Sequence, residues 1–295
     1  MKTRTECPIC GHGVWRMLCR SGLDLEGERV RFCVRCGGVF LSPHMDESDA
    51  AAYYRREYSR RYRGAERPDR AATARRDGIA QERFRGLASR FRREGLYLEI
   101  GCGAGSFLAR LAAAGHRAAG VEAAEGYAAA GRERGLAIET GTFPRCSGPA
   151  PRYDGILLFH VLEHVPEPAD LLRAIRDRLA PGGFVAIEVP DVLVALDGKF
   201  RHRYFQRPHL IDFHRASLEH LLARTGLAVE SAMYGPAGRA HHLLVVARAG
   251  TVPPSWHPPD QVRTWWRRLR RRIVLSRTLA PLSNLGSRPC LGTTS

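Results

Sequence analysis

Residues 96–106 read Leu-Tyr-Leu-Glu-Ile-Gly-Cys-Gly-Ala-Gly-Ser, and this stretch decides the fold. Its first half is a short apolar run that predicts a buried strand, and its second half carries a glycine at every other position. Such a turn holds few Cβ atoms, so the backbone can approach a ligand closely while the first amides of the following helix face it. The stretch therefore predicts a strand, a ligand-binding turn and a helix.

Short apolar runs alternate with helical patterns from residue 96 to residue 249. Such alternation predicts parallel strands joined by helices. The last two runs, at 227–232 and 242–247, are predicted to form an antiparallel pair. The predicted fold is an α/β, Rossmann-like, mostly parallel seven-stranded sheet with helices on both faces. The other strands are predicted at Tyr97–Ile100, Ala118–Val121, around Ile138, Gly155–Phe159 and Phe184–Val189, with Pro181-Gly182-Gly183 as the turn before the last of them.

Two carboxylates stand beside the glycine-rich turn. Glu99 lies in the strand before it, where it can accept from the amino group of a methionine moiety. Glu122 ends the next strand, where a carboxylate can bind both hydroxyls of an adenosine ribose. A nicotinamide fingerprint would read Gly-x-Gly-x-x-Gly, whereas the third glycine here, Gly105, comes one residue early. By itself, the turn is also compatible with a purely structural connection.

The chain resembles the class I S-adenosylmethionine-dependent methyltransferases over about residues 96–249. The resemblance implies S-adenosyl-L-methionine as cofactor and methyl transfer as activity. It departs at Gly141-Thr142, where many relatives carry an acidic residue that contacts adenine. The matching segments are Leu98–Gly105, Gly120–Glu122, Tyr153–Ile156, Phe159–Val165, Leu179–Gly183, Pro208–Leu210 and Ser217–Glu219. The implied cofactor contacts are Glu99, Gly101, Cys102, Gly103, Gly105, Glu122, Thr142 and Phe159.

The N-terminal block contains two C-x2-C pairs, Cys7/Cys10 and Cys33/Cys36, each followed by a glycine. Two such pairs can place four thiolates tetrahedrally around Zn²⁺. A block this short has little core, so the metal would supply much of its folding free energy. Because thiolates fill all four positions, the predicted zinc is structural, and the alternative is two reduced cysteine pairs without metal.

A zinc ribbon followed by a Tyr-rich stretch resembles the arrangement in many bacterial methyltransferases of sugar, polysaccharide and natural-product pathways. In that resemblance the ribbon and the linker help to close the acceptor site. The predicted divisions are a zinc ribbon at 1–45, an Arg/Tyr-rich helical linker or lid at 46–95, the methyltransferase domain at 96–249 and a basic amphipathic tail at 250–295 whose end is predicted to be disordered.

The net charge of +16 is concentrated outside the central domain. Residues 51–95 carry fourteen arginines against six acidic residues, and residues 250–295 carry eight arginines against Asp260. Only two basic residues are lysines, so the arginine excess partly reflects residue usage rather than a nucleic-acid surface. The N-terminus lacks a signal-peptide pattern and no long apolar run is present, which predicts a cytoplasmic protein with reduced thiols.

Methylation of a hydroxyl or carbon acceptor needs a group that removes a proton, and a histidine suits this task near pH 7. His160 is the first candidate because it follows the fourth strand at the carboxyl edge of the sheet, and His209 and His164 come next. For each of them the alternative is a capping or packing role. His160, Glu163 and His164 also have helical spacing, so a divalent cation site there is a disfavoured alternative.

The function predicted from these features is O- or C-methylation of a small-molecule acceptor, such as a nucleotide-linked sugar, a carrier-bound intermediate or another natural-product intermediate. One rival is an RNA methyltransferase that uses the ribbon and the Arg-rich flanks, although no RNA-binding module is recognisable. Another is a non-catalytic cofactor-binding scaffold. The loop at 191–214 is predicted either to cover the acceptor or to be a surface excursion. The tail helix is predicted to dock on its own domain or on a second subunit, with an anionic membrane or a carrier protein as the alternative surface.

Overall fold

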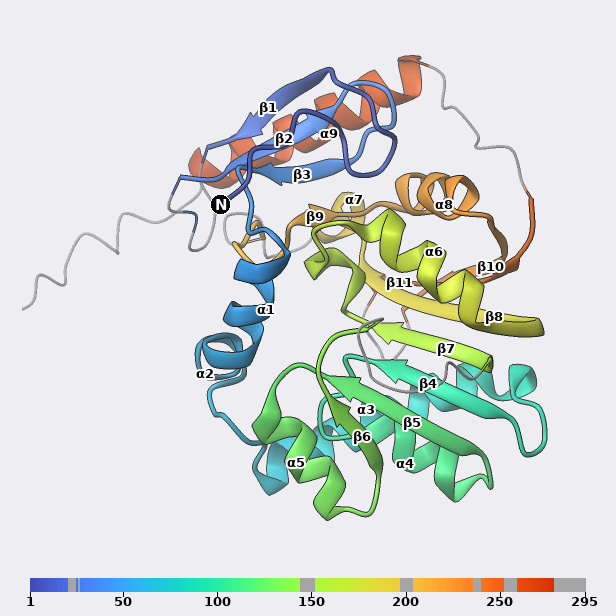
Figure 1. Ribbon diagram of the computed structural model, residues 1–295. Coiled ribbons are helices and arrows are strands. Elements are labelled where there is room, and N and C mark those ends of the chain that lie inside the picture. The colour runs from blue at the N-terminus through green and yellow to red at the C-terminus, as the bar shows by residue number, and fades with distance from the viewer. Residues whose placement is uncertain are drawn as a thin grey trace, which may run out of the picture.

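The computed structural model describes residues 1–20, 25, 27–143, 152–196, 204–235, 240–251 and 259–278. A seven-stranded sheet forms the centre of the protein (Figure 1). Its strands, in spatial order, are β10 (Leu227–Tyr234), β11 (His242–Ala249), β8 (Leu179–Pro190), β7 (Tyr153–Phe159), β4 (Leu96–Ile100), β5 (Arg117–Glu122) and β6 (Ala137–Thr140).

The strands from β8 to β6 pair in parallel, whereas β11 pairs antiparallel with both β8 and β10. This is the predicted mostly parallel sheet with a final antiparallel pair, and the predicted fold class is confirmed. One detail differs. The turn predicted at Pro181–Gly183 lies inside β8, where Leu179 pairs with Tyr153 and Phe184 pairs with Gly155. The glycines there let the chain bulge out of the ladder without ending the strand.

Helices cover both faces of this sheet because alternate strand residues are apolar on both sides. Phe184 and Ala186 of β8 pack with α3 (Arg70–Leu87) and α4 (Ser106–Ala113). Val185 and Ile187 pack on the opposite face with α6 (Pro168–Arg178) and α8 (Arg215–Arg224). The remaining helix against this sheet, α5 (Glu125–Glu133), packs against β5 and β6 (Figure 1).

A small antiparallel sheet, here called the ribbon sheet, stands at the N-terminus. It consists of β1 (Trp15–Cys19), β2 (Arg29–Cys33) and β3 (Val39–Ser42), and then of β9 (Ile211–Asp212). The first three strands carry the predicted ribbon, whereas β9 comes from a part of the chain more than 160 residues later. Sequence patterns did not indicate this fourth strand, because a two-residue strand has no periodicity of its own.

The segment between the two sheets is helical. It contains α1 (Glu47–Arg56), α2 (Tyr58–Arg63), α3 and the short 3₁₀ turn η1 (Ala88–Arg90). The side chain of Asp46 accepts from the amide of Asp49, and that of Asp69 accepts from the amide of Ala72. Each aspartate thereby satisfies a helix N-terminus that would otherwise lack a partner. Helices α1 and α2 form a column beside the sheet (Figure 1).

The tail helix α9 (Pro259–Thr278) packs on the ribbon sheet, as its predicted docking on its own domain requires. Val262, Leu269 and Ile273 are buried against Leu18, Val30 and other apolar ribbon residues. Removing these side chains from water stabilises the contact by roughly 1.5–3 kcal/mol each. Because its apolar stripe is used for this packing, α9 presents arginines at its surface.

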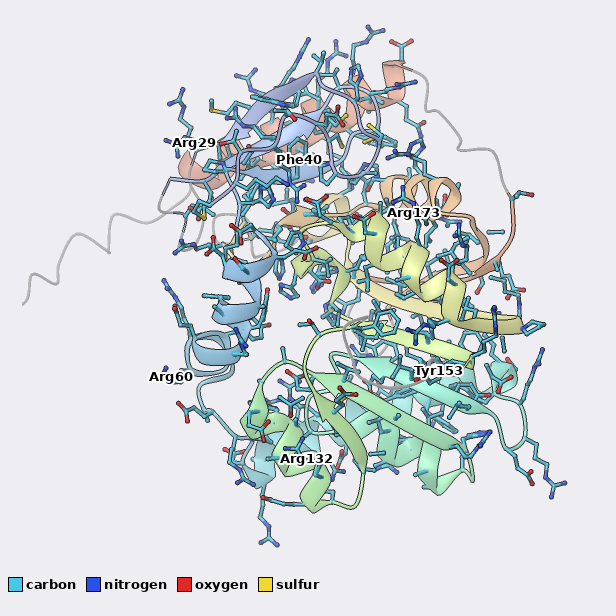
Figure 2. All side chains as sticks on the ribbon, viewed as in Figure 1. Arg29, Phe40, Arg60, Arg132, Tyr153 and Arg173 are labelled. Atoms are coloured by element: carbon cyan, nitrogen blue, oxygen red, sulfur yellow. The ribbon has the colours of Figure 1, made fainter. Side chains whose placement is uncertain are left out.

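The described part of the 191–214 segment holds α7 (Val192–Ala195) and β9, so it is partly ordered by secondary structure. Phe200 and Arg201–Arg203, and the tail end from Ser283, lie outside the described residues. Arginines lie at the periphery at several separate places, and Figure 2 shows this for Arg29, Arg60, Arg132 and Arg173. Within the described residues, no helix is long and apolar enough to cross a membrane.

Candidate active site

A cavity of about 750 Å³ opens at the carboxyl ends of β4, β5 and β7. In open α/β sheets this edge is where ligands bind, since the loops that leave neighbouring parallel strands diverge there. The cavity is bounded on its other sides by α1, α2 and α3. The predicted site residues that line it are Glu99, Gly101, Cys102, Gly103, Glu122, Thr142, Phe159, His160 and His164.

The glycine-rich turn has the backbone that the sequence requires. Gly101, Gly103 and Gly105 have φ values of 70°, 58° and 75°, which lie in the left-handed region that favours glycine. Gly101 and Gly103 line the cavity, but Gly105 does not. A Cβ atom on Gly105 would meet Leu136 Cδ1 at 2.4 Å, so this glycine permits close packing rather than ligand contact.

Glu99 is buried at the cavity, and its Oε2 has no hydrogen-bond partner. Burial raises the pKa of Glu99 to about 8, and the charge of Glu122 adds to this, although Arg83 acts in the opposite direction. An unpaired buried carboxylate is costly unless a ligand completes it. A cationic ammonium group is the ligand that fits this position, as the sequence-based role of Glu99 requires.

Glu122 is held from two sides by backbone amides. Its Oε2 accepts from Gly103 N at 2.7 Å, and its Oε1 accepts from Ala124 N at 2.9 Å. The carboxylate therefore bridges the glycine-rich turn and the start of the next loop, with lone pairs left for hydroxyl groups. Thr142 lines the same cavity at the carboxyl end of β6, so the residue that departs from the family pattern still borders the expected adenine side.

Arg83 of α3 is a cavity residue that the sequence patterns did not reveal. Its Nε and Nη2 donate to the two carboxylate oxygens of Glu188 at 2.8 and 2.6 Å. Its guanidinium lies 4.4 Å from the ring centroid of Phe159. This side-on pairing uses Nε and Nη2 and leaves the N–H groups of Nη1 for another acceptor. The sequence does not single out Arg83, because it is one of fourteen arginines in residues 51–95 and belongs to no recognisable motif.

His160 lines the cavity as predicted, but both of its ring nitrogens are engaged. Nδ1 contacts Glu163 Oε1 at 3.2 Å, and Nε2 contacts Glu188 Oε1 at 3.0 Å and His242 Nδ1 at 3.1 Å. Burial lowers the pKa of His160, but the two carboxylates outweigh it and raise the pKa to about 9. An imidazolium with both N–H groups donated offers no lone pair to an acceptor.

His164 has the opposite character. Its Nδ1 donates to the carbonyl of Pro208 at 2.8 Å, which leaves Nε2 as the basic nitrogen of the ring. Burial lowers the pKa of His164 to about 4, so the ring is neutral at physiological pH. Tyr54 and Tyr58 from the helical segment pack edge-on against it, with centroid distances of 5.5 and 5.7 Å. His164 is thus a neutral histidine fixed in one tautomer at the cavity wall.

His209, the third predicted histidine, does not line the cavity. It lies behind His164 at a ring distance of 4.9 Å. The three residues of the disfavoured cation site, His160, Glu163 and His164, do not form one group in the described structure. His160 has φ 57° and groups with Glu188 and His242, whereas Glu163 and His164 group with His209. Helical spacing failed here because His160 precedes the 3₁₀ turn η2 (Leu162–His164) and has a left-handed backbone, so the three residues do not share one face of a helix.

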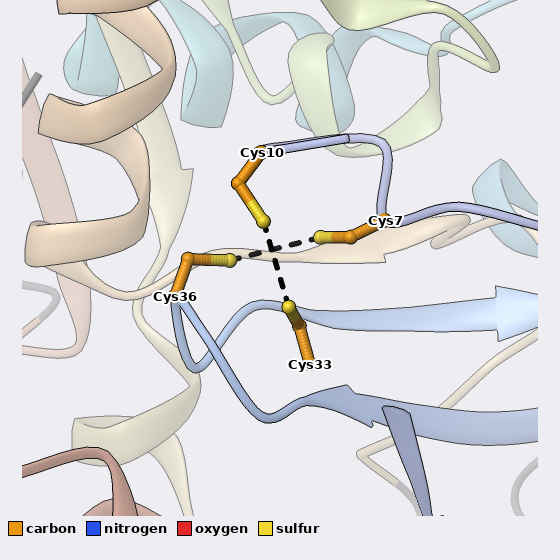
Figure 3. Close-up of side chains that lie close together, drawn as sticks. All are labelled: Cys7, Cys10, Cys33 and Cys36. Atoms are coloured by element: carbon orange, nitrogen blue, oxygen red, sulfur yellow. Dashed lines mark hydrogen bonds between the residues drawn. The ribbon is translucent and has the colours of Figure 1, made fainter. Parts of the chain in front are cut away.

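The four predicted metal ligands come together from two loops (Figure 3). Cys7 Sγ lies 3.6 Å from Cys36 Sγ, and Cys10 Sγ lies 3.5 Å from Cys33 Sγ. Tetrahedral Zn–S bonds of 2.3 Å would place sulfurs about 3.8 Å apart. The amides of Arg35 and Gly38 also point at the sulfurs of Cys33 and Cys36. The donor set and its spacing fit a zinc ion.

The sequence model of a family described as a methyltransferase domain matches residues 70–232. Ubiquinone biosynthesis O-methyltransferases are among the similar proteins. The one from Hydrogenovibrio crunogenus is 32% identical over 95 residues, which is 30% of this chain and 39% of that protein. The one from Dinoroseobacter shibae is 35% identical over 114 residues, which is 36% of this chain and 46% of that protein. The chain therefore spans less than half the length of these relatives.

Solved structures share the fold at low sequence identity. A 1,6-didemethyltoxoflavin-N1-methyltransferase from Burkholderia thailandensis, solved with S-adenosylhomocysteine, has a TM-score of 0.54 and 19% identity, covering 77% of this chain and 97% of that one. A magnesium protoporphyrin IX methyltransferase from Synechocystis has a TM-score of 0.53 and 14% identity, covering 68% and 99%. The likeness concerns the sheet and its helices.

Proposed function

The chain belongs to the methyltransferase domain family that matches residues 70–232, and we propose on this basis that it transfers a methyl group from S-adenosylmethionine to a small-molecule acceptor. The observation that carries the proposal is the buried Glu99 beside the glycine-rich turn, whose Oε2 has no hydrogen-bond partner, together with Glu122, which two backbone amides orient. A cavity of about 750 Å³ has room for the cofactor and a small acceptor side by side.

In this proposal Glu99 binds the ammonium group of the cofactor, and Arg83 binds its carboxylate. Arg83 suits this role because it is close enough to Glu99 for its charge to lower the pKa of that carboxyl group. Its guanidinium is held in place by the two hydrogen bonds to Glu188. Glu122 binds the ribose hydroxyls. Thr142 borders the adenine, and the turn residues Gly101, Cys102 and Gly103 allow the backbone to approach, with Phe159 forming part of the wall.

When bound, S-adenosylmethionine supplies an electrophilic methyl group, so the protein mainly has to align the acceptor and remove its proton. We propose that His164 Nε2 takes the proton from the acceptor, because the bond from Nδ1 to Pro208 O fixes the tautomer in which Nε2 carries the lone pair. His160 then holds Glu163 and Glu188 in place as an imidazolium at physiological pH. Tyr54 and Tyr58 complete the wall next to His164 and help to exclude water.

The finer acceptor class is an anionic one, such as a nucleotide-linked sugar. Arg75 and Arg76 of α3 line the cavity. Among the acidic residues that line the cavity, Glu167 pairs with Lys2 and Arg4, and Asp170 pairs with Arg173. These carboxylates are therefore partly neutralised, and the arginines favour an acceptor with phosphate or carboxylate groups. Methylation takes place at oxygen or carbon.

The four buried cysteines hold a structural zinc ion in this proposal. Their four thiolates would complete the metal's coordination, so the ion takes no part in the transfer step. The backbone amides that point at Cys33 and Cys36 would stabilise the thiolate charge.

The proposal is tested by cofactor binding in a matched pair of glycine variants. Gly103→Val and Gly135→Val both place a side chain at left-handed φ, 58° and 79°, but only Gly103 lines the cavity. We expect Gly103→Val to weaken S-adenosylhomocysteine binding in calorimetry by on the order of 100-fold, about 2.7 kcal/mol. Gly135→Val should bind like the wild type.

Equal affinity in the two variants would overturn the cofactor assignment. Turnover is then measured as S-adenosylhomocysteine released when nucleotide-linked sugars and other acceptors from the pathway of neighbouring genes are offered. Tight cofactor binding without transfer to any of them would favour the non-catalytic scaffold instead.

A further inference from the structure

The acceptor side of the active site is here the part of the cavity around His164. The pairing of strands β3 and β9 connects the ribbon sheet to the segment that contacts His164. Strand β3 of the ribbon pairs with β9, which places Val39 opposite Asp212 and Phe40 opposite Ile211. The pairing continues outside the strands, where Leu41 N donates to Leu210 O at 2.9 Å. The segment before β9 is thereby fixed to the ribbon by its main chain.

The same segment holds the histidine that we assign as the base. Leu210 N donates to Glu163 O at 2.9 Å, and Pro208 O accepts from His164 Nδ1 at 2.8 Å. Leu210 therefore bonds to the ribbon with its carbonyl and to η2 with its amide. A shift of this one residue would move the tautomer-fixing partner of His164.

A second connection joins the N-terminus of the ribbon to the cavity wall. Arg4 is buried, and its guanidinium donates to the carbonyl of Pro166, a cavity residue two positions after His164. The main chain of Arg4 bonds to Ser42 Oγ at the end of β3. Both ends of the His164 turn are thus attached to the ribbon.

The geometry of the ribbon depends on the four cysteines. Strand β2 ends at Cys33, and β3 begins three residues after Cys36, so the turn between them is itself the cysteine loop. The apolar Ile9 and Phe40 are fully buried around the sulfurs. Bringing four thiolates together without a cation would leave their charges uncompensated, so metal loss should loosen the β2–β3 turn and β3.

The cofactor side is built differently. Gly103 and Glu122 bond to each other, and Gly101 N donates to Val121 O at 2.7 Å. Strands β4 and β5 pair with β7 and β6 and with no ribbon strand among those described. We propose that the cysteine-bound metal positions Glu163 and His164 through Leu210 and Pro208, so that metal occupancy controls the acceptor side without controlling cofactor binding.

This inference rests on the proposed function for the role of His164, and its test reads the two sides separately. Zinc is removed from the full chain with a chelator, and Cys36→Ser is prepared alongside. Cys19→Ser is the matched control, because Cys19 is a buried ribbon cysteine outside the four-cysteine cluster. Hydrogen exchange is followed at 160–166 and 207–213, and at 97–105 and 119–124, together with calorimetric binding of S-adenosylhomocysteine.

We expect the metal-free protein and Cys36→Ser to exchange at least about tenfold faster at 160–166 and 207–213, which corresponds to a loss of about 1.4 kcal/mol of local protection. Exchange at 97–105 and 119–124 and the affinity for S-adenosylhomocysteine should stay as in the wild type. Adding zinc back to the chelated protein should restore protection, and Cys19→Ser should match the wild type throughout.

Two outcomes overturn the inference. In one, exchange rises equally on both sides and cofactor binding is lost, which would make the metal a general folding element. In the other, exchange at 160–166 and 207–213 does not change when the metal leaves. A wild-type chain that fails to bind S-adenosylhomocysteine refutes the proposed function instead, and the exchange pattern alone then decides whether the metal positions these segments.

Discussion

The cofactor side and the acceptor side of the cavity are assembled in different ways. The centre of the cofactor side comes from β4, β5 and the glycine-rich turn after β4, within residues 99–122, and Arg83, Thr142 and Phe159 border it from other elements. The acceptor side combines η2, the segment before β9, helices α1 and α2, and contacts from the ribbon. Residues from 54 to 210 must meet before His164 has its partners. A motif whose residues are close in the sequence can be recognised from their spacing, whereas a site built from distant segments cannot.

The difference extends to protonation. On the cofactor side, Oε2 of Glu99 has no hydrogen-bond partner, and burial raises the pKa of Glu99. On the acceptor side, Glu163 is equally buried, but the hydrogen bond and the charge of His160 overcome that burial and lower the pKa of Glu163 to about 2. Oε2 of Glu99 is available to a cationic group of a ligand, whereas Glu163 is already paired with the imidazolium of His160. The two sides should therefore respond differently to substitution and to pH.

The largest expected effect is a loss of methyl transfer without a loss of cofactor binding, caused by a single substitution on the acceptor side. His164→Asn keeps a donor near Pro208 O but removes the basic Nε2. We expect methyl transfer to fall by about 10²- to 10⁴-fold, the usual contribution of a general base, while the affinity for S-adenosylhomocysteine stays unchanged. Single-turnover rates and calorimetry measure the two quantities. Equal losses of both would mean that the two sides are not independent.

A smaller effect is expected from pH on the cofactor side. Because the pKa of Glu99 is raised to about 8, its carboxyl is protonated in the free protein at pH 6 and must lose that proton to bind an ammonium group. Affinity for S-adenosylhomocysteine should rise by up to about tenfold per pH unit between pH 6 and 8 and then level off.

The control is Glu99→Gln, which cannot ionise and should show weak, pH-independent affinity over the same range. Calorimetry in buffers of different ionisation enthalpy should also detect release of a proton on binding to the wild type near pH 6.5. A wild-type affinity that is flat in pH would remove the ammonium role of Glu99.

The smallest expected effect tests which part of the cofactor Arg83 contacts. Arg83→Ala should weaken S-adenosylmethionine binding by about tenfold or somewhat more, the loss expected for hydrogen bonds to a charged group. The affinity for decarboxylated S-adenosylmethionine, which lacks only the carboxylate, should fall much less in the same variant. Thermal unfolding is measured in parallel, because Glu188 loses a partner in this variant. Equal losses for both ligands would show that Arg83 acts only through packing.

Much of the fold and the cofactor side could be predicted because each signal is local. Glycines at alternate positions dictate the turn, and Glu99 and Glu122 follow from their places at strand ends. The cysteine spacing predicted a four-sulfur cluster for the same reason. Even so, Gly105 proved to be a packing residue, because spacing does not tell whether a glycine faces a ligand or a neighbouring side chain.

Only the tertiary structure decided the acceptor side. Glu163 and Glu188 come from separate elements and carry no shared pattern, yet together they raise the pKa of His160 and hold it as a bonded cation. We propose His164 as the base because Pro208, over 40 residues later, fixes its tautomer. The sequence by itself determined the sheet, the glycine-rich turn and the cysteine pairs, since these depend on neighbours along the chain. The charge state and direction of each histidine depend on neighbours in space.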